Sequence, residues 1–208
     1  MLTLDIALSF FGISILMALA PGPDNLFVLM QSAMWGKESG LMVVLGLCSG
    51  LIGHTLAVAV GLAAVFATSE TAFLLLKLFG AAYLLYLAWG AFRARPGTDP
   101  GQRPPRLSFG ALYRRGVIMN LSNPKVSLFF LAFLPQFTSP ARGSVALQIV
   151  SLGALFGLAG FLVFSTIALF SGFFSEHLQK SARTQLIINR LAGLIFLGLA
   201  IKLVLSSH

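Results

Sequence analysis

The sequence predicts an all-α, polytopic membrane protein with six transmembrane helices, arranged as two inverted three-helix repeats. Three observations support this prediction. Of the 208 residues, 57% are apolar and only 10% are charged, whereas roughly 25% are charged in an average soluble domain. The apolar residues fall into six runs, and the two halves share motifs in the same order. A soluble fold of this length would leave large apolar patches in water.

Each apolar run is long enough for a transmembrane helix, which needs about 20 residues. The six predicted spans cover about 5–34, 39–67, 72–92, 114–137, 144–174 and 186–205. We expect one transporter domain over 1–208, with repeat 1 at about 1–93, a linker at about 94–113 and repeat 2 at about 114–208. The first run starts with Asp5 and no basic residue, unlike a signal peptide, which favours a retained helix.

The net charge of +8 is distributed unevenly between the predicted loops. Ten of the 14 Lys and Arg residues lie in the alternate loops 35–38, 93–115 and 175–190. Since short cytoplasmic loops carry the excess of basic residues, this pattern places the linker in the cytoplasm and both termini outside. The charge is a topological signal, and we expect no nucleic-acid partner.

Three motifs recur in the two halves of the chain. Pro23-Asp24 corresponds to Pro124-Lys125, the glycines at 46, 50 and 53 to those at 153, 157 and 160, and Lys77-Leu-x-Gly80 to Arg190-Leu-x-Gly193. Because each half has an odd number of spans, the halves have opposite orientations, as in many secondary transporters. The glycines allow close helix packing, and an alternative is a sliding surface between the repeats.

The first span contains a helix-breaking motif, Pro21-Gly22-Pro23-Asp24-Asn25. Two prolines remove two backbone donors, so an unbroken helix is not expected here. Pro23 and Asp24 suit the first turn of a second half-helix, where proline fits and negative charge is favoured.

The fourth span has a similar break at Asn120-Leu-Ser-Asn123-Pro124-Lys125. Asn123 is the expected N-cap, and Pro124 the first helical residue. Irregular backbone at membrane depth is tolerated where protein or a water-filled cavity surrounds it. Two such breaks at equivalent positions therefore indicate a binding site, whereas ordinary proline kinks are the alternative interpretation.

Asp24 and Lys125 have opposite charges at equivalent positions of the two repeats. An unpaired charge at the centre of a bilayer costs roughly 2.5–3.5 kcal/mol. We expect both residues to face one cavity and to pair when it is empty, with a static salt bridge as the alternative. His54 is a further polar candidate, which either relays protons or hydrogen-bonds to a neighbouring helix. Gln136 either contacts substrate or hydrogen-bonds between helices.

The motifs resemble the LysE/RhtB family of bacterial exporters for amino acids and their derivatives. The resemblance rests on Pro21-Gly-Pro-Asp-Asn-Leu-Phe-Val28, on Gly80-Ala-Ala-Tyr-Leu-Leu-Tyr-Leu-Ala-Trp89, and on the stretch from Asn120 to Phe137. It covers nearly the whole chain. It implies efflux across the bacterial inner membrane, energised by the membrane potential or a proton gradient, and a transport site formed by Pro21 to Asn25 with Asn123, Pro124 and Lys125.

We therefore expect a secondary exporter of a small zwitterionic substrate, with protons as possible coupling ions and the lipid bilayer as its surroundings. The alternatives are an inorganic-cation exporter and a membrane redox or assembly protein. The sequence has no phosphate-binding loop, metal-ligand cluster or nucleophile elbow, so neither an enzyme nor a cofactor is expected.

Overall fold

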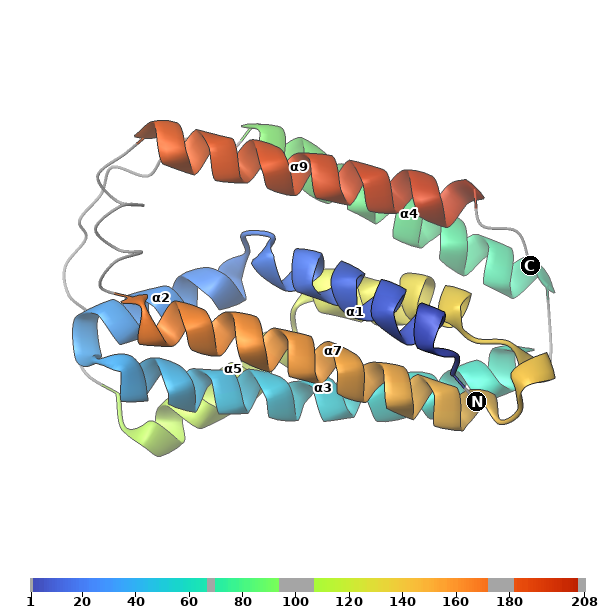
Figure 1. Cartoon of the computed structure of the whole chain (residues 1–208), viewed down its shortest axis with the longest axis horizontal. Coiled ribbons are helices and arrows are strands. Elements are labelled where there is room, and N and C mark those ends of the chain that lie inside the picture. Colours follow the sequence, from blue (N-terminus) through green and yellow to red (C-terminus); the bar gives the residue numbers. More distant parts are fainter. Residues whose placement is uncertain (1, 67–69, 94–106, 172–181, 206–208) are drawn as a thin grey trace.

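The computed structural model describes residues 2–66, 70–93, 107–171 and 182–205, and this part of the chain is helical without a strand (Figure 1). The α-helices are α1 (Leu4–Leu19), α2 (Pro23–Trp35), α3 (Lys37–Phe66), α4 (Glu70–Arg93), α5 (Phe109–Leu121), α6 (Pro124–Leu128), α7 (Val145–Leu169) and α9 (Ala182–Leu205). Three short turns are the π-helical η1 (Phe129–Phe133) and the 3-10 turns η2 (Leu134–Phe137) and η3 (Pro140–Arg142). The all-α prediction is confirmed.

The long helices form a bundle in which α3 lies between α5 and α7. Helix α2 packs against both α3 and α7, α1 packs against α7, and α4 pairs with α9 (Figure 1). Helix α1 begins and α9 ends at the same end of the bundle, whereas α3 begins at the opposite end. Segments from both halves of the chain are therefore intertwined.

Several helices are suited to a bilayer by length and composition. Two single helices meet this requirement, over Lys37–Gly61 and Val145–Leu169. Two bent pairs meet it jointly: α1 with α2, bent by 62°, and α5 with Pro124–Phe137, bent by 46°. A shorter apolar helix covers Leu78–Arg93. Within the described ranges the structure thus supports two to four spans, and the six-span inverted repeat remains a prediction.

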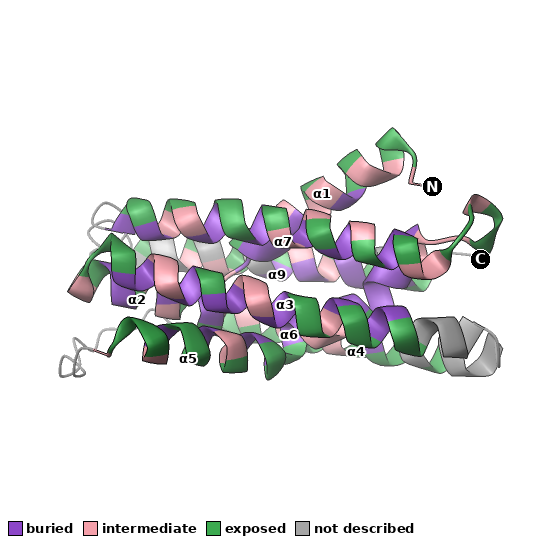
Figure 2. Ribbon diagram, turned by 90° about the horizontal axis from the view of Figure 1, so that it is seen from below, coloured by how far each residue is buried: buried purple, intermediate pink, exposed green. Residues whose placement is uncertain are grey.

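The outward faces of these helices are exposed and apolar (Figure 2). Large side chains such as Leu56, Phe79, Trp89 and Leu158 are about half exposed or more. In water such a surface would be an association or aggregation hazard, but it suits helices surrounded by lipid tails.

The buried side chains form two apolar clusters that occupy different levels of the bundle. One contains Phe10 with Phe129, Phe130 and Phe133, and Phe156 of α7 packs on it with ring centroids 5.0 Å from Phe129. The other cluster includes Val28, Val43, Leu47, Leu112 and Phe164. Along α3, Val43, Val44 and Leu47 belong to the second cluster, and Leu51 and Val58 to the first. The polar residues of the two helix breaks lie where one cluster gives way to the other.

Gly46, Gly50 and Gly53 of α3 face α5. A β-carbon on Gly46 would collide with the backbone carbonyl oxygen of Tyr113 and lie 3.0 Å from the Cα atom of Gly116. Gly50 faces Asn120 in the same way: a β-carbon on Gly50 would lie 2.8 Å from the Cβ atom of Asn120. These glycines permit close helix approach, as the packing interpretation predicts.

The corresponding glycines of α7 have other surroundings. Gly153 contacts Thr55 of α3, whereas a β-carbon on Gly157 would meet no atom of the described residues within 4 Å. The two glycine motifs therefore do not form one continuous contact between α3 and α7.

Candidate functional site

The candidate site forms where α1 ends and α2 begins. In a continuous helix the Met17 carbonyl would accept from the N–H of residue 21, but Pro21 has no N–H. Two more carbonyls, of Ala18 and Ala20, lie at the same broken end. Buried carbonyls need donors, and here side chains supply them.

Lys125 supplies one of these donors from the other half of the chain. Its Nζ atom donates to the carbonyl oxygen of Ala20 at 3.1 Å and to that of Met17 at 3.4 Å. Lys125 is 7% exposed. The carboxyl end of a helix carries partial negative charge, so this position favours a cation.

Asp24 lies on the first turn of α2 and is 2% exposed. Its Oδ2 atom accepts a hydrogen bond of 2.8 Å from Nδ2 of Asn123. Among the side chains whose burial the structure describes, Asp24 and Lys125 are the buried charged ones. An uncompensated charge of either sign would be costly inside the membrane, which makes this region unusual.

The expected direct ion pair between Asp24 and Lys125 is wrong for this structure. Asn123 donates a hydrogen bond to the carboxylate of Asp24, and the ammonium of Lys125 donates to the carbonyls of Met17 and Ala20. The reason is the proline break, because it leaves carbonyl groups that the ammonium must satisfy. Both charged side chains are buried, and it stays a prediction that they face one cavity.

Asn123 connects the two helix breaks. Its Oδ1 atom accepts from the backbone N–H of Lys125 at 3.0 Å, so Asn123 is the N-cap of α6 and Pro124 is the first helical residue, as predicted. The same side chain reaches Asp24 with its nitrogen. One amide therefore fixes the start of α6 and the orientation of the carboxylate.

Asn25 satisfies another carbonyl of the broken helix α1. Its Nδ2 atom donates to the carbonyl oxygen of Ala18 at 2.7 Å. Gly22, the N-cap of α2 before Pro23, leaves space beside it: a β-carbon there would lie 3.2 Å from Nζ of Lys125 and 3.7 Å from Oδ1 of Asn25. A larger residue at this position would enter the space around the ammonium.

His54 contacts a backbone carbonyl at the second break, which also accepts a hydrogen bond of 3.0 Å from the N–H of Asn123. Pro124 lacks the N–H that would bond to the Asn120 carbonyl in a continuous helix. The Nε2 atom of His54 lies 3.1 Å from that carbonyl oxygen, and it must donate because the partner is an acceptor. His54 also lies beside Phe130, with ring centroids 5.7 Å apart.

Gln136 lies outside this set of contacts. Its side chain donates to the Ala132 carbonyl, one turn away in its own segment, at 3.5 Å. No hydrogen bond within the described ranges connects it to Asp24 or Lys125. The predicted role of Gln136 in substrate binding therefore has no support from its position.

Several buried acceptors have no donor among the described protein atoms. They are Oδ1 of Asp24, Oδ1 of Asn25, Oε1 of Gln31 and Oδ1 of Asn120. Buried polar atoms normally have a partner, so this acceptor-rich region is suited to a ligand that donates hydrogen bonds. Gln31 is not among the predicted site residues, although its position within an apolar run was a usable signal.

The carbonyls of Met17 and Ala20 are also absent from the predicted site, because backbone groups have no residue-type signature. A proline four residues after Met17 is the signal that could have identified the first of them.

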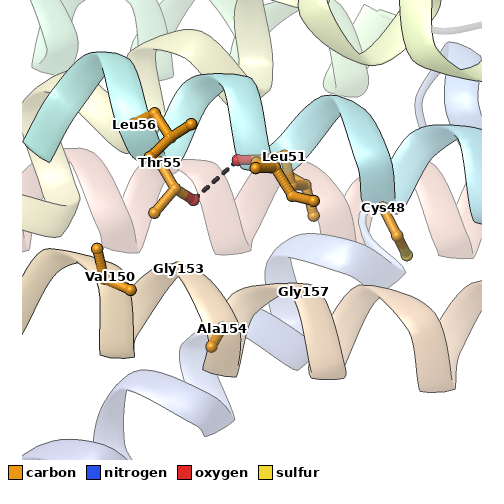
Figure 3. A pocket seen from close by; sticks show the side chains of 9 residues that line it. Cys48, Leu51, Thr55, Leu56, Val150, Gly153, Ala154 and Gly157 are labelled. Atoms are coloured by element: carbon orange, nitrogen blue, oxygen red, sulfur yellow. Dashed lines mark hydrogen bonds between the residues drawn. The ribbon is translucent and has the colours of Figure 1, made fainter.

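A separate cavity of about 240 Å³ lies between α3 and α7 (Figure 3). Its lining includes Cys48, Leu51, Thr55, Val150 and Gly157. The Thr55 hydroxyl donates to the Leu51 carbonyl at 2.8 Å, as Figure 3 shows. This lining offers a zwitterion no charged group, so the polar cluster at the helix breaks is the better candidate site.

Replacing Asn123 by Ser tests its connecting role. Ser keeps the N-cap but is too short to reach Asp24, so the buried carboxylate loses its hydrogen bond, at about 1–2 kcal/mol. We expect the melting temperature of the detergent-purified protein to fall by roughly 2–8 °C. Asn123→Ala should cost a few degrees more, because it also removes the cap. A wild-type melting temperature for both variants would contradict this role.

The comparisons with known proteins agree with the resemblance that the motifs suggest. The family model described as LysE type translocator matches residues 15–207. The chain is 29% identical over 192 residues to a leucine efflux protein of Salmonella typhimurium, covering 91% of this chain and 90% of that protein. It is also 28% identical over 208 residues to the uncharacterized membrane protein YrhP of Bacillus subtilis, covering 96% of this chain and 98% of that protein. No solved structure matches the chain.

Proposed function

Since the chain belongs to the LysE type translocator family, a family of multi-pass membrane proteins, we propose that it exports a small amino acid or amino-acid derivative from the cytoplasm. The leucine efflux proteins among its relatives support this substrate class. The observation that carries the proposal is the buried cluster of Asp24, Asn123 and Lys125 between two broken helices.

The cluster offers groups for both charges of a zwitterion. Asp24 has one carboxylate oxygen without a donor, which suits a substrate ammonium. Lys125 suits the substrate carboxylate once it leaves the Met17 and Ala20 carbonyls. The N-terminal ends of the half-helices α2 and α6 add favourable positive potential for a carboxylate. Substrate would thus replace contacts that the chain makes with itself.

We propose further that six spans form two inverted repeats and that export proceeds by alternating access. The repeated Pro-Asp and Pro-Lys motifs support this arrangement, because binding sites of such transporters lie at broken helices between the repeats. The basic loops support a cytoplasmic linker and outside termini. Coupling to the proton motive force in the bacterial inner membrane is part of the same proposal, and so are the assigned roles of Pro21, Pro23, His54 and Asn120.

Efflux from proteoliposomes tests the proposal directly. The purified protein is reconstituted, and the vesicles are loaded with a panel of labelled amino acids and derivatives. We expect efflux of one or a few of them above that of protein-free vesicles, and faster efflux with an imposed proton gradient.

The same vesicles distinguish the alternatives. Efflux of a divalent cation without any amino acid would support an inorganic-cation exporter. No efflux of any compound from well-folded protein would contradict the proposed function.

A further inference from the structure

We propose that the Lys125 ammonium is a tethered cation: it occupies an oxygen-lined site that would otherwise take a free monovalent cation such as Na⁺ or a small ammonium ion. This inference concerns the site of the proposed exporter, but its binding test does not depend on export.

The first argument is the set of oxygens around the ammonium. Two backbone carbonyls, of Met17 and Ala20, contact Nζ of Lys125 at 3.4 and 3.1 Å. They belong to the carboxyl end of α1, where the helix dipole favours positive charge. Carbonyls at the ends of broken helices are the groups that coordinate monovalent cations inside transporters.

The second argument is the presence of further oxygens that lack donors. Oδ1 of Asn25 and Nζ of Lys125 both border the space beside Gly22, at 3.7 and 3.2 Å from a β-carbon placed there. This Asn25 oxygen has no hydrogen-bond partner among the described residues, and neither has Oδ1 of the adjacent Asp24. The region therefore has more acceptors than the single ammonium satisfies.

The third argument is the origin of the cation. Lys125 comes from α6, more than 100 residues away from α1 along the chain, so it is not the basic residue that often caps its own helix. Its charge is buried at a site where the chain has removed its own donor by placing Pro21 four residues after Met17. A cation supplied by the protein itself makes a free cation unnecessary.

The test is cation binding by the Lys125→Ala variant. This substitution removes the ammonium and its stem and leaves the oxygens in place. Thermal unfolding is measured in detergent. The reference salt is N-methylglucamine chloride, which is then replaced by NaCl or by methylammonium chloride at constant ionic strength. We expect the melting temperature of Lys125→Ala to rise by roughly 5–10 °C at about 100 times the dissociation constant.

Matched variants separate a cation site from general effects of salt. Lys125→Met fills the space of the stem without a charge, so neither cation should raise its melting temperature. Neither cation should raise the melting temperature of the wild-type protein or of Lys37→Ala, a substitution at an exposed position. If Lys125→Ala gains no more than Lys125→Met, the proposal is overturned.

A measurement on the wild-type protein covers the case in which Lys125→Ala does not fold. The melting temperature of the wild-type protein should be the same in NaCl and in N-methylglucamine chloride. A wild-type protein that needs Na⁺ for stability would overturn the proposal, because its site would then hold a free cation. Failure of the proposed export would instead leave these melting temperatures unaffected.

Discussion

Export by the Asp24→Asn variant is expected to be at least about 30-fold slower than wild-type export. The substitution keeps the size of the side chain and its contact with Asn123, because an amide oxygen can still accept that hydrogen bond. It removes the charge that would bind the substrate ammonium. A hydrogen bond between charged groups contributes about 2 kcal/mol, which corresponds to roughly 30-fold.

The measurement is initial efflux from proteoliposomes that contain equal amounts of variant and wild-type protein. Asp5→Asn is the matched control, since Asp5 is exposed at the start of α1, and its efflux should be unchanged. Both variants should insert and give a single peak on size-exclusion chromatography. Wild-type efflux by Asp24→Asn would show that the carboxylate has no part in transport.

Replacing Gly46 by Val should lower the melting temperature by roughly 6–12 °C, which corresponds to at least about 3 kcal/mol. A β-carbon at this position collides with the Tyr113 carbonyl oxygen and approaches Gly116 at 3.0 Å. Both obstacles are backbone atoms of α5, so no rotamer change can relieve them. Helices α3 and α5 would have to separate.

Gly61→Val is the control in the same helix. No atom of the described residues lies within 4 Å of a β-carbon at Gly61, so this substitution should leave the melting temperature nearly unchanged. Equal melting temperatures for Gly46→Val and Gly61→Val would contradict the close packing of α3 against α5. The comparison separates a steric effect from the change in helix propensity, which both variants share.

The sequence predicted the local features of the fold well, because they depend on neighbouring residues. A proline removes a donor wherever it stands, so the breaks before Pro23 and Pro124 follow from composition alone. The N-cap at Asn123 follows in the same way from residue type and position. The apolar runs likewise indicate a membrane protein without any tertiary contact.

For the candidate site, the sequence singled out Asp24, Asn123 and Lys125 but not the groups that they contact. Opposite charges at equivalent positions suggested that Asp24 and Lys125 meet. The structure instead places Asn123 against the carboxylate and the broken end of α1 against the ammonium. Which acceptor an ammonium takes depends on distances across the bundle, which are not encoded in spacing along the chain.

By itself, the sequence determined the membrane class, the helix breaks and the small number of charges placed at them. The tertiary structure decided which groups those charges contact, that Gly46, Gly50 and Gly53 of α3 face α5, and that His54 reaches the second break. The physical reason is the range of the interactions. Proline geometry, capping and hydrophobicity act within a few residues, whereas the partner of a buried charge is set by how distant helices pack together.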